Sequence, residues 1–182
     1  MFSGKTSQLI SEYKKFSNTK TKVICLKPLI DNRYSKQLKK KNIFGCDVMC
    51  SKIISHDDKK IDAYIIDSIS DETMEKIIDG YDLFIIDELQ FIKKSREFIT
   101  KLLNKSKMII ASGLNGDFNQ VQFNAISDVI PIASDLFFNK SICYFCNGEA
   151  PYTIRKNKKT KKKVIIGGDE LYCAVCLKCV HK

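Results

Sequence analysis

A Gly-Lys-Thr triplet at residues 4–6 constrains the fold of this chain more than any other feature of its sequence. Gly-Lys-Thr closes a phosphate-binding loop, in which backbone N–H groups surround phosphate oxygens, the lysine meets the β- and γ-phosphates and the threonine hydroxyl binds Mg²⁺. The apolar residues from Leu9 to Phe16 recur at helical spacing. The triplet therefore stands where the loop requires it, at the N-terminus of a helix.

The chain opens inside this motif. In the full pattern, G-x-x-x-x-G-K-[ST], the first glycine and the strand that carries it would precede Met1. Because a phosphate loop needs a strand to anchor one end, we expect the sequence from Met1 to lack a central strand and to expose apolar surface. We expect the natural protein to begin at an earlier start.

A second strong signal is an apolar run that ends in two acids, Ile85-Ile86-Asp87-Glu88. An acid at the C-terminal end of a buried strand is where a P-loop fold holds Mg²⁺. Ligands of open α/β sheets also lie outside such strand ends. We therefore assign Mg²⁺ to Asp87 and a general-base role to Glu88. The competing interpretation is an ordinary pair of acids at a helix start.

Apolar strands alternate with helical patterns through residues 1–140, which we take as a nucleotide-binding domain. The expected strands are 22–27, 63–66, 81–88 and 107–113, and helices are expected to begin near Thr6, Ser70 and Lys93. This alternation predicts an α/β fold of the P-loop (RecA-like) kind, with a mostly parallel sheet and helices on both faces. Residues 33–42 are polar and lysine-rich, which predicts a loop.

Glycine, cysteine and lysine dominate residues 141–182, which we take as a second, smaller domain. Paired C-x-x-C segments predict a four-thiolate, tetrahedral zinc site, which is structural and does not imply catalysis. Cys143-x-x-Cys146 is the first pair, and the spacing alone allows either Cys173-x-x-Cys176 or Cys176-x-x-Cys179 as the second.

A glycine-rich segment with aromatic residues, Gly113 to Phe123, directly follows the last expected strand of the first domain. Aromatic side chains among small and polar residues at this place could stack on a nucleobase. By composition alone, anchoring of a loop into the core is the competing interpretation.

The net charge of +10 raises the question of nucleic acid, but all except three of the 31 basic residues are lysines. Recognition of base edges and phosphates favours arginine, so the composition favours a solvated basic surface and argues against a nucleic-acid partner. No apolar run has the length of a membrane span, and no signal-peptide pattern opens the chain. We expect a cytoplasmic protein without a membrane partner.

These features, in this order, resemble the cellular and poxvirus-type thymidine kinases, a family of small zinc-containing enzymes. The resemblance covers nearly the whole chain. Besides the paired cysteines, it rests on Met1-Phe2-Ser3-Gly4-Lys5-Thr6, Asp31-Asn32-Arg33-Tyr34, Ile86-Asp87-Glu88-Leu89-Gln90-Phe91, Gly113-Leu114-Asn115-Gly116-Asp117-Phe118, Tyr152-Thr153-x-Arg155 and Ile166-Gly167-Gly168-x-x-x-Tyr172.

The resemblance implies transfer of the γ-phosphate of ATP to thymidine, with Glu88, Lys5 and Arg33 as the catalytic residues. Glu88 would accept the proton of the thymidine 5′-hydroxyl. ATP and Mg²⁺ would contact Met1, Phe2, Ser3, Gly4, Lys5, Thr6, Asp31, Arg33, Asp87 and Gln90. Thymidine would contact Phe91, Leu114, Phe118, Phe123, Thr153, Lys163, Val164, Ile165, Ile166, Gly167 and Tyr172.

The resemblance also implies that the segment from Lys163 to Gly167 is a lasso that holds the thymine edge with main-chain groups. The second cysteine pair of the family begins four residues after the tyrosine that is Tyr172 here. One Zn²⁺ would therefore bind to Cys143, Cys146, Cys176 and Cys179. The family further implies a homotetramer.

The chain departs from the family pattern in three places. Its start is missing, Leu89 stands where a smaller residue is usual, and the family's Thr-His-Asp is not found near residues 44–47. The alternative from another class is a P-loop ATPase or regulator with a nucleic-acid-binding zinc ribbon. The basic charge fits that alternative, whereas the scarcity of arginine speaks against it.

Overall fold

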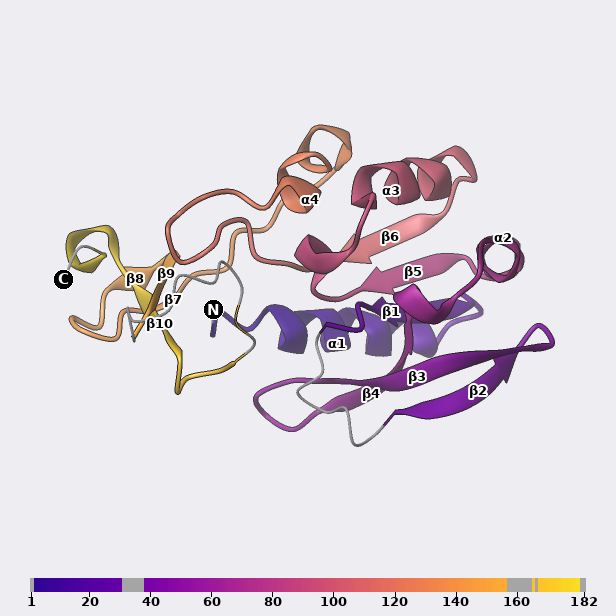
Figure 1. The fold of residues 1–182 in the computed structure, drawn as a ribbon, viewed down its shortest axis with the longest axis horizontal. Helices are drawn as coiled ribbons and strands as arrows, with labels where there is room; N and C mark the ends of the chain where they lie inside the picture. Colours follow the sequence, from indigo (N-terminus) through magenta and orange to yellow (C-terminus); the bar gives the residue numbers. More distant parts are fainter. Residues whose placement is uncertain (1, 31–37, 157–164, 166, 181–182) are drawn as a thin grey trace.

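A six-stranded sheet with helices on both faces, and a smaller β unit beyond one end of it, make up the chain (Figure 1). The computed structural model describes residues 2–30, 38–156, 165 and 167–180. The strands of the sheet are β1 (Val23–Lys27), β2 (Lys39–Ile43), β3 (Cys46–Ile54), β4 (Lys60–Ile65), β5 (Leu83–Ile86) and β6 (Met108–Ala111). The helices are α1 (Lys5–Ser17), α2 (Asp71–Gly80), α3 (Ser95–Asn104) and the short α4 (Asn124–Ser127).

The sheet is mostly parallel, as the alternation of strands and helices predicts. Its order is β2-β3-β4-β1-β5-β6. The four strands from β4 to β6 run parallel, and β2 and β3 form an antiparallel hairpin beyond β4. Because α1 leads back into β1, its first turn and the C-terminal ends of β1 and β5 lie at the same edge of the sheet (Figure 1).

Alternate residues of the central strands build two cores, one on each face of the sheet. On one face, Leu83 and Ile85 of β5 join the cluster that contains Leu9 and Ile10 of α1. On the other face, the intervening β5 residues pack against α2 and α3, in the cluster of Phe84, Ile86, Ile77, Ile78 and Leu102. Full burial of each such side chain contributes about 1.5–3 kcal/mol. The expectation of helices on both faces is confirmed.

The expected start of the second helix is confirmed by its cap. The backbone N–H of Thr73 donates to Oγ of Ser70 at 3.3 Å, and α2 begins at Asp71, directly after Ser70. One expectation is wrong: residues 39–42, predicted as part of a loop, belong to β2. Lys39, Lys40 and Lys41 are exposed on this edge strand, so the apolar alternation that announces a strand is missing from its sequence.

Strand β6 forms the opposite edge of the sheet and is far less covered than its neighbour β5. All four residues of β5 are buried, whereas Met108 of β6 is 44% exposed. Within the described residues no strand precedes α1, and β6 pairs with β5 alone. Leu136, Phe137 and Phe138 are further large apolar residues that are exposed.

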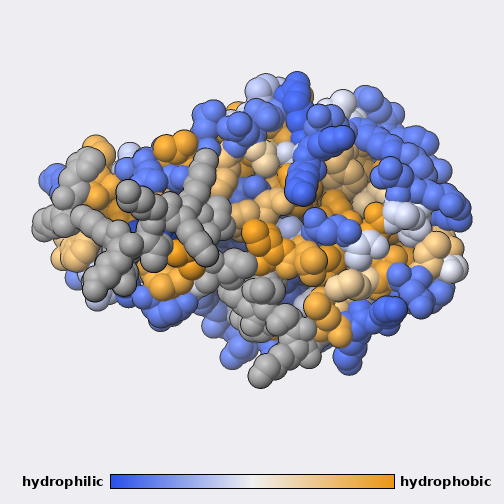
Figure 2. All heavy atoms as spheres, viewed as in Figure 1, coloured by the Kyte–Doolittle hydropathy of each residue, from blue (hydrophilic) through white to orange (hydrophobic). Residues whose placement is uncertain are grey.

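The smaller unit contains two antiparallel pairs, β7 (Ser141–Ile142) with β8 (Glu149–Ala150), and β9 (Tyr152–Arg155) with β10 (Tyr172–Val175). It contacts the phosphate loop, because Oγ of Ser141 donates to the carbonyl oxygen of Phe2 at 3.0 Å. On the face seen in Figure 2, hydrophilic residues lie over much of α3. The boundary at residue 140 stays a prediction.

Candidate functional site

The phosphate loop ends in a left-handed glycine. Gly4 has φ 77° and directly precedes α1, a conformation that costs a glycine little. No side chain caps the helix and its first turn holds no acid, so its N–H groups are not blocked by a carboxylate. Together with the helix dipole, these N–H groups suit a bound phosphate. Lys5 and Thr6 lie in this first turn.

Asp87 and Glu88 follow β5 at the sheet edge where α1 begins. Both side chains are buried, at 4% and 8% exposure. Oγ of Ser112 donates to Oδ1 of Asp87 at 2.6 Å, which fixes the carboxylate beside the end of β6. Glu88 is in the left-handed conformation at φ 52° and ψ 44°, which is strained for a residue with a Cβ. This conformation turns the chain at Glu88, two residues after β5 ends.

Gln90 connects Glu88 to the loop after β6. Its Nε2 donates to Oε2 of Glu88 at 2.5 Å, and its Oε1 accepts from the backbone N–H of Leu114 at 3.0 Å. A Cβ on Gly113 would lie 2.7 Å from Oε1 of Gln90, so the absence of a side chain there is what gives Gln90 room. The geometry thus places Gln90 beside Glu88 and the expected nucleoside wall.

Several aromatic residues expected around thymidine are close together. Phe91 and Phe123 meet edge to face with ring centroids 6.0 Å apart. Phe118 lies under the guanidinium of Arg155, whose carbon is 3.8 Å from the ring centroid and 5.6 Å from the Tyr172 ring centroid. The structure therefore brings Phe118 and Tyr172 into contact with the same arginine.

The lasso contacts Tyr172 through Ile165, one of its two described residues. The Tyr172 hydroxyl donates to the carbonyl oxygen of Ile165 at 2.8 Å, and the N–H of Ile165 lies 3.4 Å from the same hydroxyl. Thr153 is buried on β9, two residues before Arg155. Six predicted site residues lie outside the described residues: Met1, Asp31, Arg33, Lys163, Val164 and Ile166.

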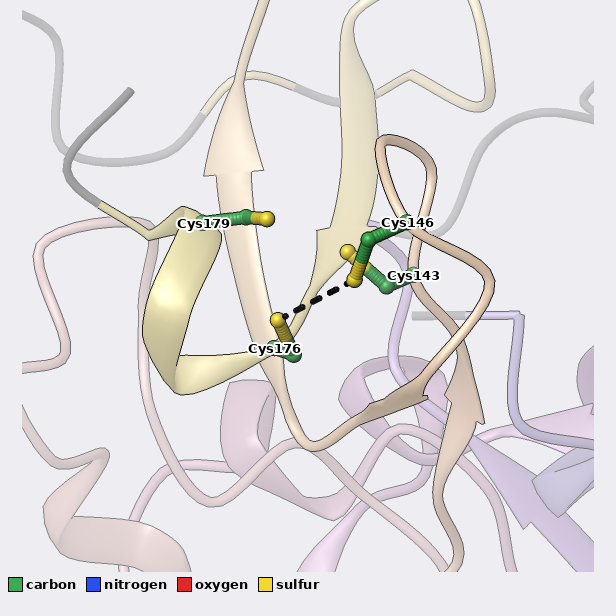
Figure 3. A group of neighbouring side chains, drawn as sticks. All are labelled: Cys143, Cys146, Cys176 and Cys179. Carbon is green, nitrogen blue, oxygen red and sulfur yellow. Dashed lines mark hydrogen bonds between the residues drawn. The ribbon is translucent and has the colours of Figure 1, made fainter.

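Four cysteine sulfurs converge in the smaller unit (Figure 3). The sulfurs of Cys143, Cys146, Cys176 and Cys179 all lie within 4.8 Å of one another, and those of Cys146 and Cys176 are 3.5 Å apart. A tetrahedral ion with bonds of about 2.3 Å to sulfur would need separations of about 3.8 Å, so the cluster fits a metal ion with little adjustment. Cys173 is buried in the adjacent core and is not part of the cluster.

The thiols of this cluster ionise unevenly. Burial opposes ionisation of Cys143, but the backbone N–H groups of Cys176, Phe145 and Cys146 outweigh it and lower its pKa to about 6. Burial raises the pKa of Cys179 to about 12, and hydrogen bonds with the neighbouring thiols add to this shift. A divalent cation among the sulfurs would stabilise every thiolate at once, because its charge offsets their mutual repulsion.

One element beside the phosphate loop escaped the sequence reasoning. The turn Ser55-His56-Asp57 follows β3, and Asp57 Oδ1 accepts from Oγ of Ser7 at 3.1 Å. The His56 ring lies 5.3 Å from the Phe2 ring, centroid to centroid. This triplet differs from the expected Thr-His-Asp only in its first residue. It lies about ten residues beyond residues 44–47 because the β2–β3 hairpin precedes it.

Comparison with known proteins agrees with this combination of a phosphate loop, an acid pair and a cysteine cluster. A protein-family profile described as "Thymidine kinase" matches residues 1–180. The chain belongs to the thymidine kinase family.

Curated thymidine kinases of poxviruses are similar over nearly their full length. The chain is 32% identical to the thymidine kinase of Amsacta moorei entomopoxvirus over 185 residues, which cover all of this chain and 93% of that protein. It is 36% identical to that of Choristoneura fumiferana entomopoxvirus, covering 92% of it, and 31% identical to that of Variola virus, covering 91% of it. No helix in the described part of this thymidine kinase family member has the length and apolar character needed to cross a membrane.

Proposed function

We propose that the chain transfers the γ-phosphate of ATP to the 5′-hydroxyl of thymidine and so forms thymidine 5′-monophosphate. The observation that carries this proposal is the buried Glu88 carboxylate, which Gln90 connects to Leu114 of the aromatic loop. Glu88 lies between the end of β5 and that loop. A general base at this place can face both the phosphate loop and a nucleoside.

Each residue of the site has a separate task in this reaction. The first turn of α1 binds the phosphates through its N–H groups, and the Lys5 ammonium balances their charge. Glu88 takes the proton of the 5′-hydroxyl as its oxygen attacks the γ-phosphorus and the bond to the β-phosphate oxygen breaks. Asp87 and Thr6 would hold Mg²⁺, which supplies further charge neutralisation at the phosphates. Arg33 is our candidate for steadying the transferring oxygens.

The nucleoside would lie against the aromatic loop and the smaller unit. We propose Phe91, Leu114, Phe118 and Phe123 as its contacts on the α/β side. On the other side we propose Thr153, Tyr172 and the lasso from Lys163 to Gly167. Closure of these two walls would exclude water, which otherwise competes with the hydroxyl as acceptor.

We propose that the cysteine cluster holds one structural Zn²⁺. Four thiolates with no open position are typical of structural zinc, and β10 runs directly from Tyr172 to the ligand Cys176. The metal would therefore fix the end of β10 that carries the nucleoside wall, and it would take no part in phosphoryl transfer. A homotetramer remains our proposal from the family resemblance, and the cytoplasmic location remains a prediction.

ATP consumption in the presence of single nucleosides tests this function. We expect consumption to depend on thymidine. Hydrolysis that DNA stimulates and thymidine leaves unchanged would instead identify the ATPase alternative.

A further inference from the structure

Arg155 is a charged side chain buried at the junction between the α/β unit and the smaller unit. It ends β9 and is only 5% exposed. A buried guanidinium costs free energy unless its surroundings compensate the charge and its N–H groups. The contacts that Arg155 makes therefore indicate why an arginine stands at this position.

The guanidinium lies over Phe118, one aromatic wall of the proposed nucleoside site. Its central carbon is 3.8 Å from the centroid of the Phe118 ring, a distance typical of stacking. Phe118 belongs to the loop after β6, so this contact reaches from the smaller unit to the α/β unit.

The same guanidinium contacts a second residue of the proposed nucleoside site, Tyr172, by a hydrogen bond. Nη2 of Arg155 donates to the Tyr172 hydroxyl at 3.3 Å, and the strand register sets Tyr172 directly opposite Arg155 on β10. The hydroxyl in turn donates to the carbonyl oxygen of Ile165 at 2.8 Å. A tyrosine hydroxyl accepts and donates at the same time, so both bonds can be made together.

We propose that Arg155 is a positioning residue that sets the spacing of Phe118 and Tyr172 and, through the Tyr172 hydroxyl, the place of the lasso at Ile165. This inference rests on the proposed function, because it assigns these residues to the nucleoside site. The guanidinium combines a planar, charged stacking surface with several N–H donors at its rim, whereas the lysine ammonium is a compact point charge, so lysine cannot replace arginine here.

Replacement of Arg155 should act on thymidine and leave ATP alone. The phosphate loop lies at the start of α1. Both aromatic partners of the guanidinium, Phe118 and Tyr172, belong to the proposed nucleoside walls. In Arg155→Met we expect the KM for thymidine to rise on the order of tenfold, the size expected from losing one buried cation–π contact and one hydrogen bond. The KM for ATP and kcat should stay within about twofold, because the lost contacts serve the bound nucleoside before and during transfer alike.

The experiment measures both KM values, kcat and zinc content for wild type, Arg155→Met, Arg155→Lys, Tyr172→Phe and the double variant Arg155→Met/Tyr172→Phe. Arg155→Lys should fail to restore the KM for thymidine. Tyr172→Phe keeps the ring but loses every hydrogen bond of the hydroxyl, including the one from Arg155. Its effect and that of Arg155→Met should therefore be less than additive in the double variant. Arg96→Met is the matched control, since Arg96 is an exposed arginine on α3 that donates to the Asp128 carbonyl oxygen, and it should behave as wild type.

Three results would overturn the inference. The first is an unchanged KM for thymidine in Arg155→Met, and the second is full rescue by Arg155→Lys. The third is a joint loss of zinc, kcat and ATP binding in every Arg155 variant, which would make Arg155 an anchor of the fold. If the wild type is active and any of these results is found, only the role of Arg155 is rejected and the proposed function stands. If the wild type does not consume ATP in the presence of thymidine, the proposed function and this inference are both rejected.

Discussion

Gln90 holds Glu88 in place: Nε2 of Gln90 lies 2.5 Å from Oε2 of Glu88, and both side chains are buried. The other end of the same amide accepts from Leu114 at 3.0 Å. The Gln90 side chain therefore connects Glu88, the proposed general base, to Leu114 in the proposed nucleoside wall.

Glu88→Gln should remove most turnover while nucleotide binding remains. The amide has nearly the shape of the carboxylate and can still bond to Gln90, but it cannot accept the proton of the 5′-hydroxyl. Loss of a general base costs on the order of 10²–10⁴-fold in rate. We would measure kcat together with direct ATP binding, and full activity in this variant would exclude Glu88 from the role.

Gly113→Ala should disturb Gln90 without touching the acids. A Cβ there would lie 2.6 Å from Cδ1 of Ile126 and 2.7 Å from Oε1 of Gln90, so one of them must move. Overpacking of this kind costs about 1–3 kcal/mol of stability, and a displaced contact near the reacting groups can lower the rate by up to about 100-fold.

Gly116→Ala provides the matched control for this loop. An added Cβ at Gly116 meets nothing closer than the Val121 carbonyl oxygen at 3.5 Å, which is an ordinary contact. We expect the midpoint temperature of thermal unfolding and kcat to be near the wild-type values for Gly116→Ala. Both values should be lower for Gly113→Ala. Equal behaviour of the two variants would contradict the role assigned to Gln90.

Metal analysis should find one zinc for each chain and separate two adjacent cysteines. Cys176→Ser removes a member of the cluster and should lose the metal, whereas Cys173→Ser alters a core residue outside the cluster and should retain it. The opposite order of metal contents would overturn the assignment of the ligands.

Removal of the zinc should weaken thymidine binding more than ATP binding. Strand β10 places Tyr172 four residues before Cys176, a proposed zinc ligand, while the phosphate loop lies in the α/β unit. Chelation followed by separate titration of the two ligands measures the difference. A similar loss for both ligands would indicate that the metal supports the whole fold.

The sequence predicts the parts of the fold that carry a strong periodic or apolar signal. Strands β1, β5 and β6 are apolar runs, and Ser70 is recognisable as a cap before α2. Strand β2 was missed because Lys39 to Lys41 face solvent at the sheet edge, where no apolar residue is needed. An edge strand of this kind leaves no apolar pattern to read.

The candidate site was predictable in its residue types and less so in its connections. The acids and the cysteine pairs follow from spacing, and the family resemblance selected Cys176 and Cys179 over Cys173. The bridge from Gln90 to Leu114 depends on the left-handed conformation of Glu88 and on the space at Gly113, neither of which a motif encodes. Arg155 was visible only as part of a motif, because its stacking on Phe118 joins distant parts of the chain.

Product formation from thymidine and ATP is the most direct test of the central claim, with deoxyguanosine supplied as a competing acceptor. We expect thymidine 5′-monophosphate to form in wild type and to fall steeply in Glu88→Gln, with little phosphorylation of the bulkier purine nucleoside. Phosphorylation of deoxyguanosine at a rate comparable to thymidine, or ATP hydrolysis that no nucleoside affects, would contradict this account.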